Sequence, residues 1–311
     1  MTVRIVTDST ADLPPDVLQE LDITVVPACV IFGNKTYRDG IDISQDEVYH
    51  KMIDENIPVS TSQPPPIDFA NTYRKILKDT DEIVSIQATS KLSGLYNSAL
   101  QGREMTNENN RIAVLDSLSV SMGLGLLTIL AARLAKAGEN LPTIVDKVKQ
   151  SVPQIRLWGF FDTLKYALQG GRLGKAKALL GSILPIKAIL TMRDGELHPT
   201  GVVRTRIKGI ERLVDNFRKS VAVQDTAVVY STTPNDAHTL KERISTISDN
   251  IPIHISRLGP ALGVHGGPGT LILALREKVV NLGQEMMENE MSKKHISLQS
   301  IHRPKLDFVC F

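Results

Sequence analysis

The sequence predicts an α/β protein of two domains, an N-terminal doubly wound, mostly parallel sheet and a C-terminal α+β domain with a mixed sheet. In the first half, short β-branched runs alternate with helix-like segments, the pattern of parallel βαβ units. In the second half, Asp194-Gly195 separates two strand-like runs, and this dipeptide favours a hairpin between antiparallel strands. The length of 311 residues suits about two domains. We place them at residues 1–153 and 154–284, followed by a polar tail at 285–311.

Apolar runs and the prolines between them assign the elements of the first domain. Expected strands are residues 3–7, 23–32, 82–88 and 112–116. Expected helices are a short one opening around Pro14-Pro15 and residues 44–55, 67–78, 93–105, 120–136 and 141–152. Three consecutive prolines at 64–66 forbid a continuous helix, so residues 60–66 are expected to form a loop.

The second domain is expected to mix strands and helices in a different rhythm. A strand is expected at 157–164 and a hairpin at 188–198. Helices at 206–221 and 235–247 then alternate with strands at 226–231 and 253–257. This order predicts an α+β domain with a mixed sheet.

Composition and charge argue against several classes of protein. The 36 basic and 34 acidic side chains leave a net charge of +2, and one Trp, six Tyr and seven Phe offer few stacking platforms, so no nucleic-acid partner is expected. No membrane span is expected, because no run of about 18 apolar residues occurs. The lack of a signal-like N-terminus, together with only two cysteines, predicts a cytoplasmic protein. Neither the cysteines nor the histidines have metal-site spacing, so no metal and no cofactor are expected.

Common catalytic and nucleotide-binding motifs are absent. The segment from Gly170 to Ala176 fails as a phosphate-binding loop, because Gln169 replaces its first glycine and Ala176 its final hydroxyl residue. Thr128 stands where a dinucleotide fingerprint needs a third glycine, and the residues around Ser93 do not form a hydrolase elbow.

Two hydroxyl-bearing segments are candidates for an anion site. Thr61 and Ser62 precede one expected helix, and Ser93 begins another just after a strand. Unpaired N–H groups and the helix dipole make such starts suitable for a carboxylate or phosphate. Alternatively, Thr61 and Ser93 are ordinary helix caps.

Three further polar residues have open alternatives. His265 lies in a stretch with five glycines and two prolines, which presents it from a loop as a site residue or as a turn residue without function. Arg172 is an anion partner or a solvated loop cation. Asp8, at the end of the first strand, is a helix cap, a magnesium ligand or a catalytic carboxylate.

Six short motifs together resemble the DegV family in order and spacing. They are Thr7-Asp8-Ser9-Thr10-Ala11-Asp12-Leu13, Tyr37-Arg38-Asp39-Gly40, Thr61-Ser62-Gln63-Pro64, Ser90-Lys91-Leu92-Ser93-Gly94-Leu95-Tyr96, Gln169-Gly170-Gly171-Arg172 and His265-Gly266-Gly267-Pro268-Gly269. The resemblance implies a two-domain α/β carrier with a tunnel, between or within the domains, for a long-chain fatty acid such as palmitate, stearate or oleate. It also implies that the protein is not itself an enzyme and presents the acyl carboxylate to the catalytic subunit of a fatty acid kinase, which makes an acyl phosphate from ATP.

The same resemblance assigns roles to four residues. Thr61 and Ser93 match the positions whose hydroxyls hold the carboxylate, and Arg172 and His265 match polar positions around that head group. Pro65-Pro66, Gly266 and the tail beyond about residue 285 depart from the family pattern, and they bear on chain-length preference and partner docking.

Two other functions compete with the carrier. One is an enzyme acting on a small anionic metabolite, with His265 as general acid/base and Arg172 as anion clamp. The other is a protein-interaction module whose site is closed to ligands. The preferred acyl chain, the partner kinase, the oligomeric state and the role of the tail are not predicted.

Overall fold

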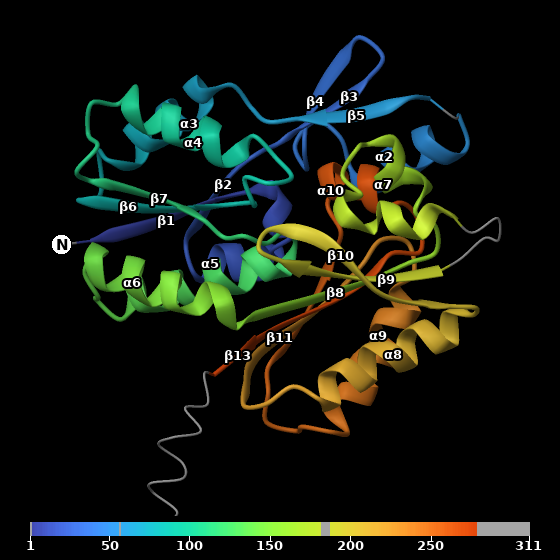
Figure 1. The fold of residues 1–311 in the computed structure, drawn as a ribbon. Coiled ribbons are helices and arrows are strands. Elements are labelled where there is room, and N and C mark those ends of the chain that lie inside the picture. Colours follow the sequence, from blue (N-terminus) through green and yellow to red (C-terminus); the bar gives the residue numbers. More distant parts are fainter. Residues whose placement is uncertain (1, 56, 182–186, 279–311) are drawn as a thin grey trace, which may run out of the picture. The chain divides into compact units, whose positions relative to one another are not determined.

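A computed structural model describes residues 2–55, 57–181 and 187–278 of the chain. Residues 2–277 belong to one compact unit, in which the described residues form three sheets (Figure 1). Both the parallel sheet and the mixed sheet expected from the sequence are present, which confirms the predicted fold class. The boundary at 153–154 stays a prediction, and the tail at 285–311 lies outside the described residues.

The first sheet is parallel throughout, with strand order β2-β1-β6-β7. Its strands are β1 (Val3–Asp8), β2 (Ile23–Val26), β6 (Glu82–Gln87) and β7 (Ile112–Asp116). The helices that contact these strands are α1 (Pro15–Glu20), α3 (Pro66–Ile76), α4 (Leu95–Glu104), α5 (Met122–Lys136) and α6 (Leu141–Ser151). Figure 1 shows α3 and α4 on one face of the sheet and α5 and α6 on the other, so the sheet is doubly wound.

The second sheet is mixed, with strand order β10-β9-β8-β13-β11-β12. Its strands are β8 (Ile155–Phe161), β9 (Lys187–Arg193), β10 (Glu196–Val203), β11 (Val223–Tyr230), β12 (Ile253–Arg257) and β13 (Leu271–Glu277). All neighbours are antiparallel except β11 and β12. Between these strands lie α7 (Lys165–Gln169), the 3-10 helix η3 (Gly174–Gly181), α8 (Arg206–Arg218), α9 (Pro234–Ser245) and α10 (Pro260–Gly266).

Helix α5 is buried between the two large sheets. Leu124, Leu127 and Ala131 pack into the core of the parallel sheet. Met122 and Ile129 pack into a second core that includes residues of β8, β11 and β13. Because both faces of this helix are covered, its sequence is apolar all round instead of amphipathic.

A third, antiparallel sheet was not predicted. It contains β3 (Cys29–Phe32), β4 (Lys35–Arg38) and β5 (Val59–Ser62), in the order β4-β3-β5, and α2 (Gln45–Ile53) lies between β4 and β5 along the chain. The expected single strand at 23–32 is therefore wrong, because the chain leaves the parallel sheet at Pro27, which has no N–H to continue it. The expected loop at 60–66 is wrong as well, because residues 59–62 pair with β3.

The predicted hairpin around Asp194-Gly195 is confirmed. Strands β9 and β10 pair directly across it, with Glu196 opposite Arg193. Asp194 and Gly195 have φ angles of 51° and 81°, and positive φ at both central residues is the mark of a type I′ turn. The two short 3-10 helices η1 (Ser9–Ala11) and η2 (Val152–Gln154) complete the described elements.

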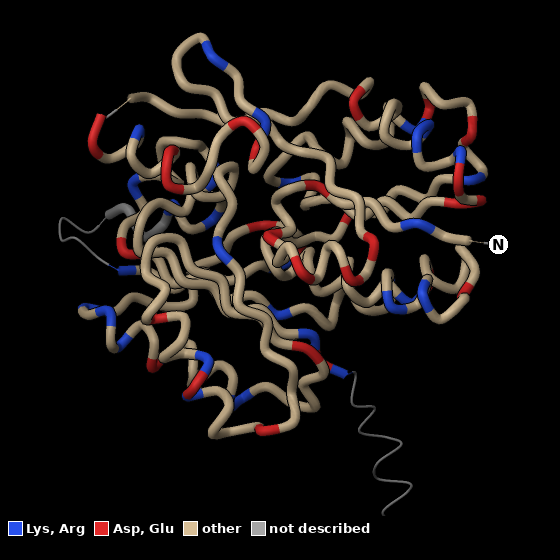
Figure 2. The backbone as a smooth tube through the Cα atoms, turned by 180° about the vertical axis from the view of Figure 1, so that it is seen from behind, with Lys and Arg blue, Asp and Glu red and all other residues tan. Residues whose placement is uncertain are grey.

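Charged residues of both signs are interspersed along the backbone (Figure 2), in keeping with the net charge of +2. None of the helices in the described ranges is long and apolar enough to cross a membrane.

Candidate functional site

A cavity lies where the three sheets meet α7 and α10. All four residues predicted for the site, Thr61, Ser93, Arg172 and His265, line it. The space free of protein atoms is about 990 Å³ when the open solvent at the mouth is included. The remaining lining is mostly apolar, with residues such as Val120, Leu157, Phe161, Leu258, Leu262 and Ile272.

Thr61 reaches the cavity from a strand. It belongs to β5 and pairs with Val30 of β3, so neither the expected loop nor the alternative of a helix cap is correct for this residue. Its Oγ1 lies 2.8 Å from Nε2 of His265 in a hydrogen bond whose direction depends on the tautomer of the ring. A residue of the third sheet is thereby joined to one that lies 204 positions later in the chain.

His265 lies in the last turn of α10, so the expectation of a loop is wrong. The ring has little room: a Cβ on Gly170 would lie 2.1 Å from its Nδ1, so only glycine allows the backbone of this loop to approach so closely. Nδ1 has no hydrogen-bond partner in the described part of the chain. The glycine-rich composition that suggested a loop reflects close packing around a short helix.

The imidazole of His265 is neutral near pH 7. Burial is the main cause, and the positive charge of Arg172 adds to it, so that the pKa of His265 falls to about 4. A neutral ring can offer one N–H donor and one acceptor, but it provides no cation for an anionic ligand. Arg172 is therefore the charged group among the four predicted residues.

Arg172 and Ser93 lie on neighbouring loops. The guanidinium of Arg172 donates to the carbonyl oxygen of Gly170 at 2.6 Å and to that of Leu92 at 3.4 Å. Ser93 follows Leu92 directly, and its Oγ accepts the N–H of Leu95 at 3.3 Å. Gly94, not Ser93, is the N-cap residue of α4. All four predicted residues thus line one cavity, with Thr61 bonded to His265 and Arg172 bonded to the residue before Ser93.

Strand β8 contributes one part of the apolar wall of the cavity. Leu157, Gly159 and Phe161 all line it, because alternate residues of a strand face the same side. The Phe161 ring lies over Gly159, where an added Cβ would be 2.7 Å from Cε2 of the ring. Sequence reasoning assigned no site role to these residues, although their spacing of two within an expected strand was a usable signal.

Three buried aspartates lie close to the cavity end of β1. Asp8 caps η1 by accepting the N–H of Thr10 at 2.9 Å, and its other oxygen accepts the N–H of Ala88 at 2.8 Å, which supports the capping alternative. Asp12 and Asp39 are also almost fully buried. Within residues 2–55, 57–181 and 187–278, no cluster of three or more His, Cys, Asp or Glu could hold a metal ion.

Burial raises the pKa of each of these aspartates. The pKa of Asp12 rises to about 8, with the neighbouring charges of Asp39 and Asp8 as smaller causes, and that of Asp39 rises to about 6. The pKa of Asp8 is raised in the same direction and for the same main reason. The sequence analysis quoted the motifs that contain Asp12 and Asp39 but gave neither residue a role.

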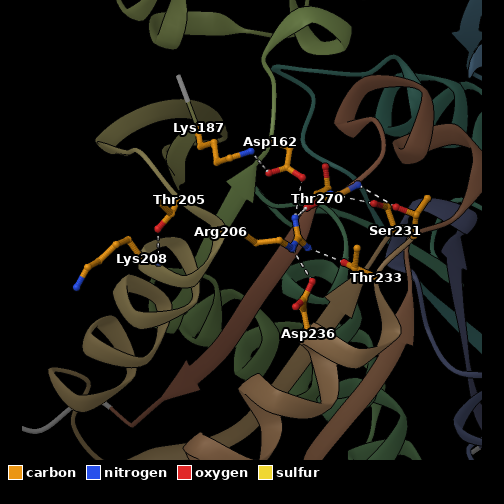
Figure 3. A network of polar contacts seen from close by, with 11 residues as sticks. Asp162, Lys187, Thr205, Arg206, Lys208, Ser231, Thr233, Asp236 and Thr270 are labelled. Carbon is orange, nitrogen blue, oxygen red and sulfur yellow. Dashed lines mark hydrogen bonds and ion pairs between the residues drawn. The ribbon is translucent and has the colours of Figure 1, made fainter. Parts of the chain in front are cut away.

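The loop that follows α10 is held by Arg206 (Figure 3). Its Nη1 donates to Oδ2 of Asp162 and to the carbonyl oxygen of Gly269, both at 2.8 Å. Its Nε donates to Oδ2 of Asp236 at 2.5 Å, and its Nη2 to Oγ1 of Thr233 at 2.6 Å. One guanidinium therefore fastens this loop to the ends of β8 and α9.

Gly266, one of the departures from the family pattern, is tightly enclosed. A Cβ at this position would lie 3.1 Å from both Cδ2 of Leu258 and Oγ1 of Thr270. Thr270 supplies a hydroxyl beside it, donating to the carbonyl oxygen of Gly266 at 2.8 Å. A larger residue would need both neighbours to move.

Fold and cavity together define a mixed α/β protein with a cavity whose lining is mostly apolar and includes several polar residues. Residues 2–278 match the profile described as "Uncharacterised protein, DegV family". The chain belongs to the DegV family.

Individual relatives agree with this assignment. A DegV domain-containing protein of Caldanaerobacter subterraneus subsp. tengcongensis is 33% identical over 279 residues, which cover 89% of this chain and 99% of that protein. The structure entitled "Fatty Acid Binding of a DegV family Protein from Thermus thermophilus" is 29% identical, with a TM-score of 0.82 over 89% of this chain and 100% of that one. A fat acid (stearic acid)-binding protein of Eubacterium ventriosum is 26% identical, with a TM-score of 0.79 over 88% and 98% of the two chains.

Proposed function

We propose that the protein binds one long-chain fatty acid, with the carboxylate at the end formed by Thr61, Ser93, Arg172 and His265 and the acyl chain along the apolar walls. The observation that carries the proposal is a single cavity whose mostly apolar lining also contains these four polar residues. The similar proteins of T. thermophilus and E. ventriosum, whose descriptions state fatty acid and stearic acid binding, support it. The apolar walls favour an acyl chain over the small polar metabolite of the rival hypothesis.

The polar end has suitable donors for a carboxylate. When Nε2 of His265 carries the proton, it donates to Oγ1 of Thr61 and leaves the Thr61 hydroxyl hydrogen free for the ligand. Oγ of Ser93 accepts the N–H of Leu95, so the hydrogen of the Ser93 hydroxyl points away from Leu95 and can be donated to the ligand. Arg172 adds the positive charge, and charge-assisted hydrogen bonds are stronger than neutral ones. These contacts need no metal.

The acyl chain supplies most of the gross binding energy. Burying about fifteen methylene groups corresponds to roughly 12 kcal/mol of transfer free energy. Ordering the chain and losing its translational freedom offset part of that. The contacts of the head group therefore mainly determine the orientation of the ligand, and the acyl chain mainly determines its affinity.

We further propose that the protein presents this carboxylate to the catalytic subunit of a fatty acid kinase. In that reaction a carboxylate oxygen attacks the γ-phosphorus of ATP, the bond to ADP breaks, and an acyl phosphate forms. The neutral, buried His265 and the absence of nucleotide motifs from the sequence support a carrier whose chemistry takes place in its partner.

Lipid analysis of purified protein tests the binding proposal. Denaturing extraction followed by mass spectrometry should yield about one fatty acid per chain when the protein is expressed in bacteria. Delipidated protein should then take up labelled palmitate or oleate but not short carboxylates such as acetate. A lipid-free preparation that also binds no labelled fatty acid contradicts the proposal.

A double substitution tests the head-group residues. Thr61→Ala with Ser93→Ala should lower acyl phosphate formation about tenfold or more in the presence of the kinase subunit, because two hydroxyl donors are lost. Ser60→Ala is the matched control, since Ser60 is exposed in the same strand and does not line the cavity. Turnover equal to that of the control, in a protein with unchanged thermal stability, removes these hydroxyls from the mechanism.

A further inference from the structure

Two buried aspartates lie beneath the N-terminus of α10, the helix that carries His265. Oδ1 of Asp12 accepts the backbone N–H of Gly259 at 2.8 Å. The backbone N–H of Ala261 faces the carboxylate of Asp39, and this interaction partly offsets the rise that burial causes in the pKa of Asp39. Only 6% of Asp12 and 4% of Asp39 is exposed, so water does not compete for these bonds.

Hydroxyl groups fix the orientation of both carboxylates. Ser121 donates to Oδ2 of Asp12 at 2.6 Å. Ser9 donates to Oδ2 of Asp39 at 2.7 Å, and its own Oγ accepts the N–H of Ala28 at 3.0 Å. Each aspartate therefore has one oxygen bonded to a serine of the N-terminal part of the chain. The same carboxylate also contacts the backbone of α10.

The two carboxylates converge on Gly259. A Cβ added there would lie 3.0 Å from Oδ1 of Asp12 and 3.7 Å from both carboxylate oxygens of Asp39. The backbone at the start of α10 thus rests directly on this acidic pair. Neither aspartate forms an ion pair with a described residue, so serine hydroxyls and the backbone of α10 are their polar partners.

The position of His265 depends on where this helix begins. Helix α10 has seven residues, too few to be stable without tertiary contacts. Ala261 precedes His265 by one helical turn, or roughly 6 Å along the axis. The ring fits between Thr61, to which it is hydrogen-bonded at 2.8 Å, and the backbone of Gly170. A shift of the helix start would therefore break the bond to Thr61 or force the ring against Gly170.

We propose that Asp12 and Asp39 are positioning residues for His265. By accepting two backbone N–H groups at the start of α10, they fix the position of this helix along its axis. They do not touch the ligand, because neither lines the cavity. This role accounts for Asp12 of the first family motif and Asp39 of the second, which the ligand site itself does not use. The ligand-binding part of the test rests on the proposed function, whereas the placement of His265 can be tested without any ligand.

The ligand-free test measures the reactivity of His265 toward diethyl pyrocarbonate by peptide mass spectrometry, with exposed His50 as internal reference. Asp39→Ala should increase the modification rate of His265 about tenfold relative to His50, because the loosened helix exposes the ring. Asp39→Asn should restore protection, since its amide oxygen can accept from Ala261 and its amide nitrogen can donate to Ser9. Asp42→Ala is the matched control, because Asp42 is an exposed carboxylate on the same loop that pairs with Arg38.

If the Asp39→Ala protein does not fold, the Ser9→Ala variant is tested in its place. Removing the Ser9 hydroxyl frees one oxygen of Asp39 without leaving a cavity beneath α10. We expect the same change in His265 reactivity, but smaller. Unchanged protection of His265 in every folded variant overturns the proposal, as does an Asp39→Asn protein as reactive as the alanine variant.

The ligand test separates positioning from general damage. Asp39→Ala should weaken palmitate binding about tenfold and hexadecanol binding less than twofold, because the alcohol has the same chain but no carboxylate. In a His265→Ala background, Asp39→Ala should cause no further loss. Equal losses for both ligands, or additive losses in the double variant, overturn the proposal. If the unaltered protein binds no palmitate, the proposed function fails, and His265 reactivity alone decides the role of Asp39.

Discussion

The segment from Gly259 to Gly269 is fixed at its two ends by opposite chemistry. At its start, Asp12 and Asp39 accept backbone N–H groups and have no cation among the described residues to balance them. At its end, Arg206 donates to the carbonyl oxygen of Gly269 and is balanced by Asp162 and Asp236. The acidic end, formed by Asp12 and Asp39, should therefore tolerate substitution by Asn, but its stability should depend on pH. The balanced end, formed by Arg206, Asp162 and Asp236, should not depend on pH near neutrality. It should lose much of its stabilising effect when Arg206 is removed.

The largest effect is expected from Arg206→Ala. Removing the guanidinium leaves Asp162 paired with Lys187 alone and Asp236, which is partly buried, without a cation among the described residues. Breaking such a network costs about 3 kcal/mol of the free energy of unfolding. Urea unfolding would measure it, with Lys208→Ala as an exposed control on the same helix. A loss as small as that of the control would show that the balanced end is not an anchor.

A second, smaller effect is expected from Gly269→Ala. Gly269 has φ of 76°, and its added Cβ would lie 2.1 Å from Oδ2 of Asp162, so backbone strain and a clash with the network combine to cost about 2–3 kcal/mol. Gly171→Ala is the matched control, because its φ is 70° but nothing lies within 4 Å of the new Cβ. The control should lose only about 1–2 kcal/mol. Equal losses of unfolding free energy in the two variants would mean that the clash with Asp162 does not contribute to the effect of Gly269→Ala.

The smallest effect is a pH dependence at the acidic end. Burial raises the pKa of Asp12 to about 8 in the folded protein, whereas the unfolded carboxyl titrates near 3.8. The folded state holds the extra proton, so this contribution to stability is complete below the unfolded pKa and is lost as pH rises through 8. Between pH 7 and pH 8 the free energy of unfolding should fall by about 1 kcal/mol.

Asp12→Asn isolates that contribution, because the amide imitates the protonated acid at every pH. Denaturant melts at pH 7 and pH 8 should show a smaller decrease for this variant than for the unaltered protein. Asp39, with a pKa of about 6, is largely ionised over this interval and contributes little to the difference. Identical pH slopes in both proteins would contradict the raised pKa of Asp12.

Local patterns in the sequence were sufficient for much of the fold. Strands of the parallel sheet, the helices between them and the Asp194-Gly195 hairpin all follow from periodicity and turn chemistry within a few residues. The third sheet could not be predicted in this way. Residues 59–62 have the sequence Val-Ser-Thr-Ser, with no apolar alternation, and they form a strand only because β3 lies beside them.

The site shows the same division between local and long-range information. Local patterns made Thr61, Ser93, Arg172 and His265 candidates, and the family resemblance gave them roles. Their convergence depends on contacts such as that between Thr61 and His265, which no local pattern encodes. The roles of Asp12 and Asp39 were missed because an acidic residue is expected at the surface or at a cap. Their burial becomes visible only when α10 packs onto them.

The order of strands in the mixed sheet has a consequence for synthesis on the ribosome. Strand β13 is the last described strand in the chain, yet it lies between β8 and β11 in the middle of the sheet. Until Glu277 has emerged, β8 and β11 lack the partner between them, and the cavity lacks the wall provided by Ile272. The nascent chain carries Thr61 and Ser93 well before it can enclose an acyl chain. The emergence of β13, and not the folding of the parallel sheet, therefore sets the moment at which the cavity can close.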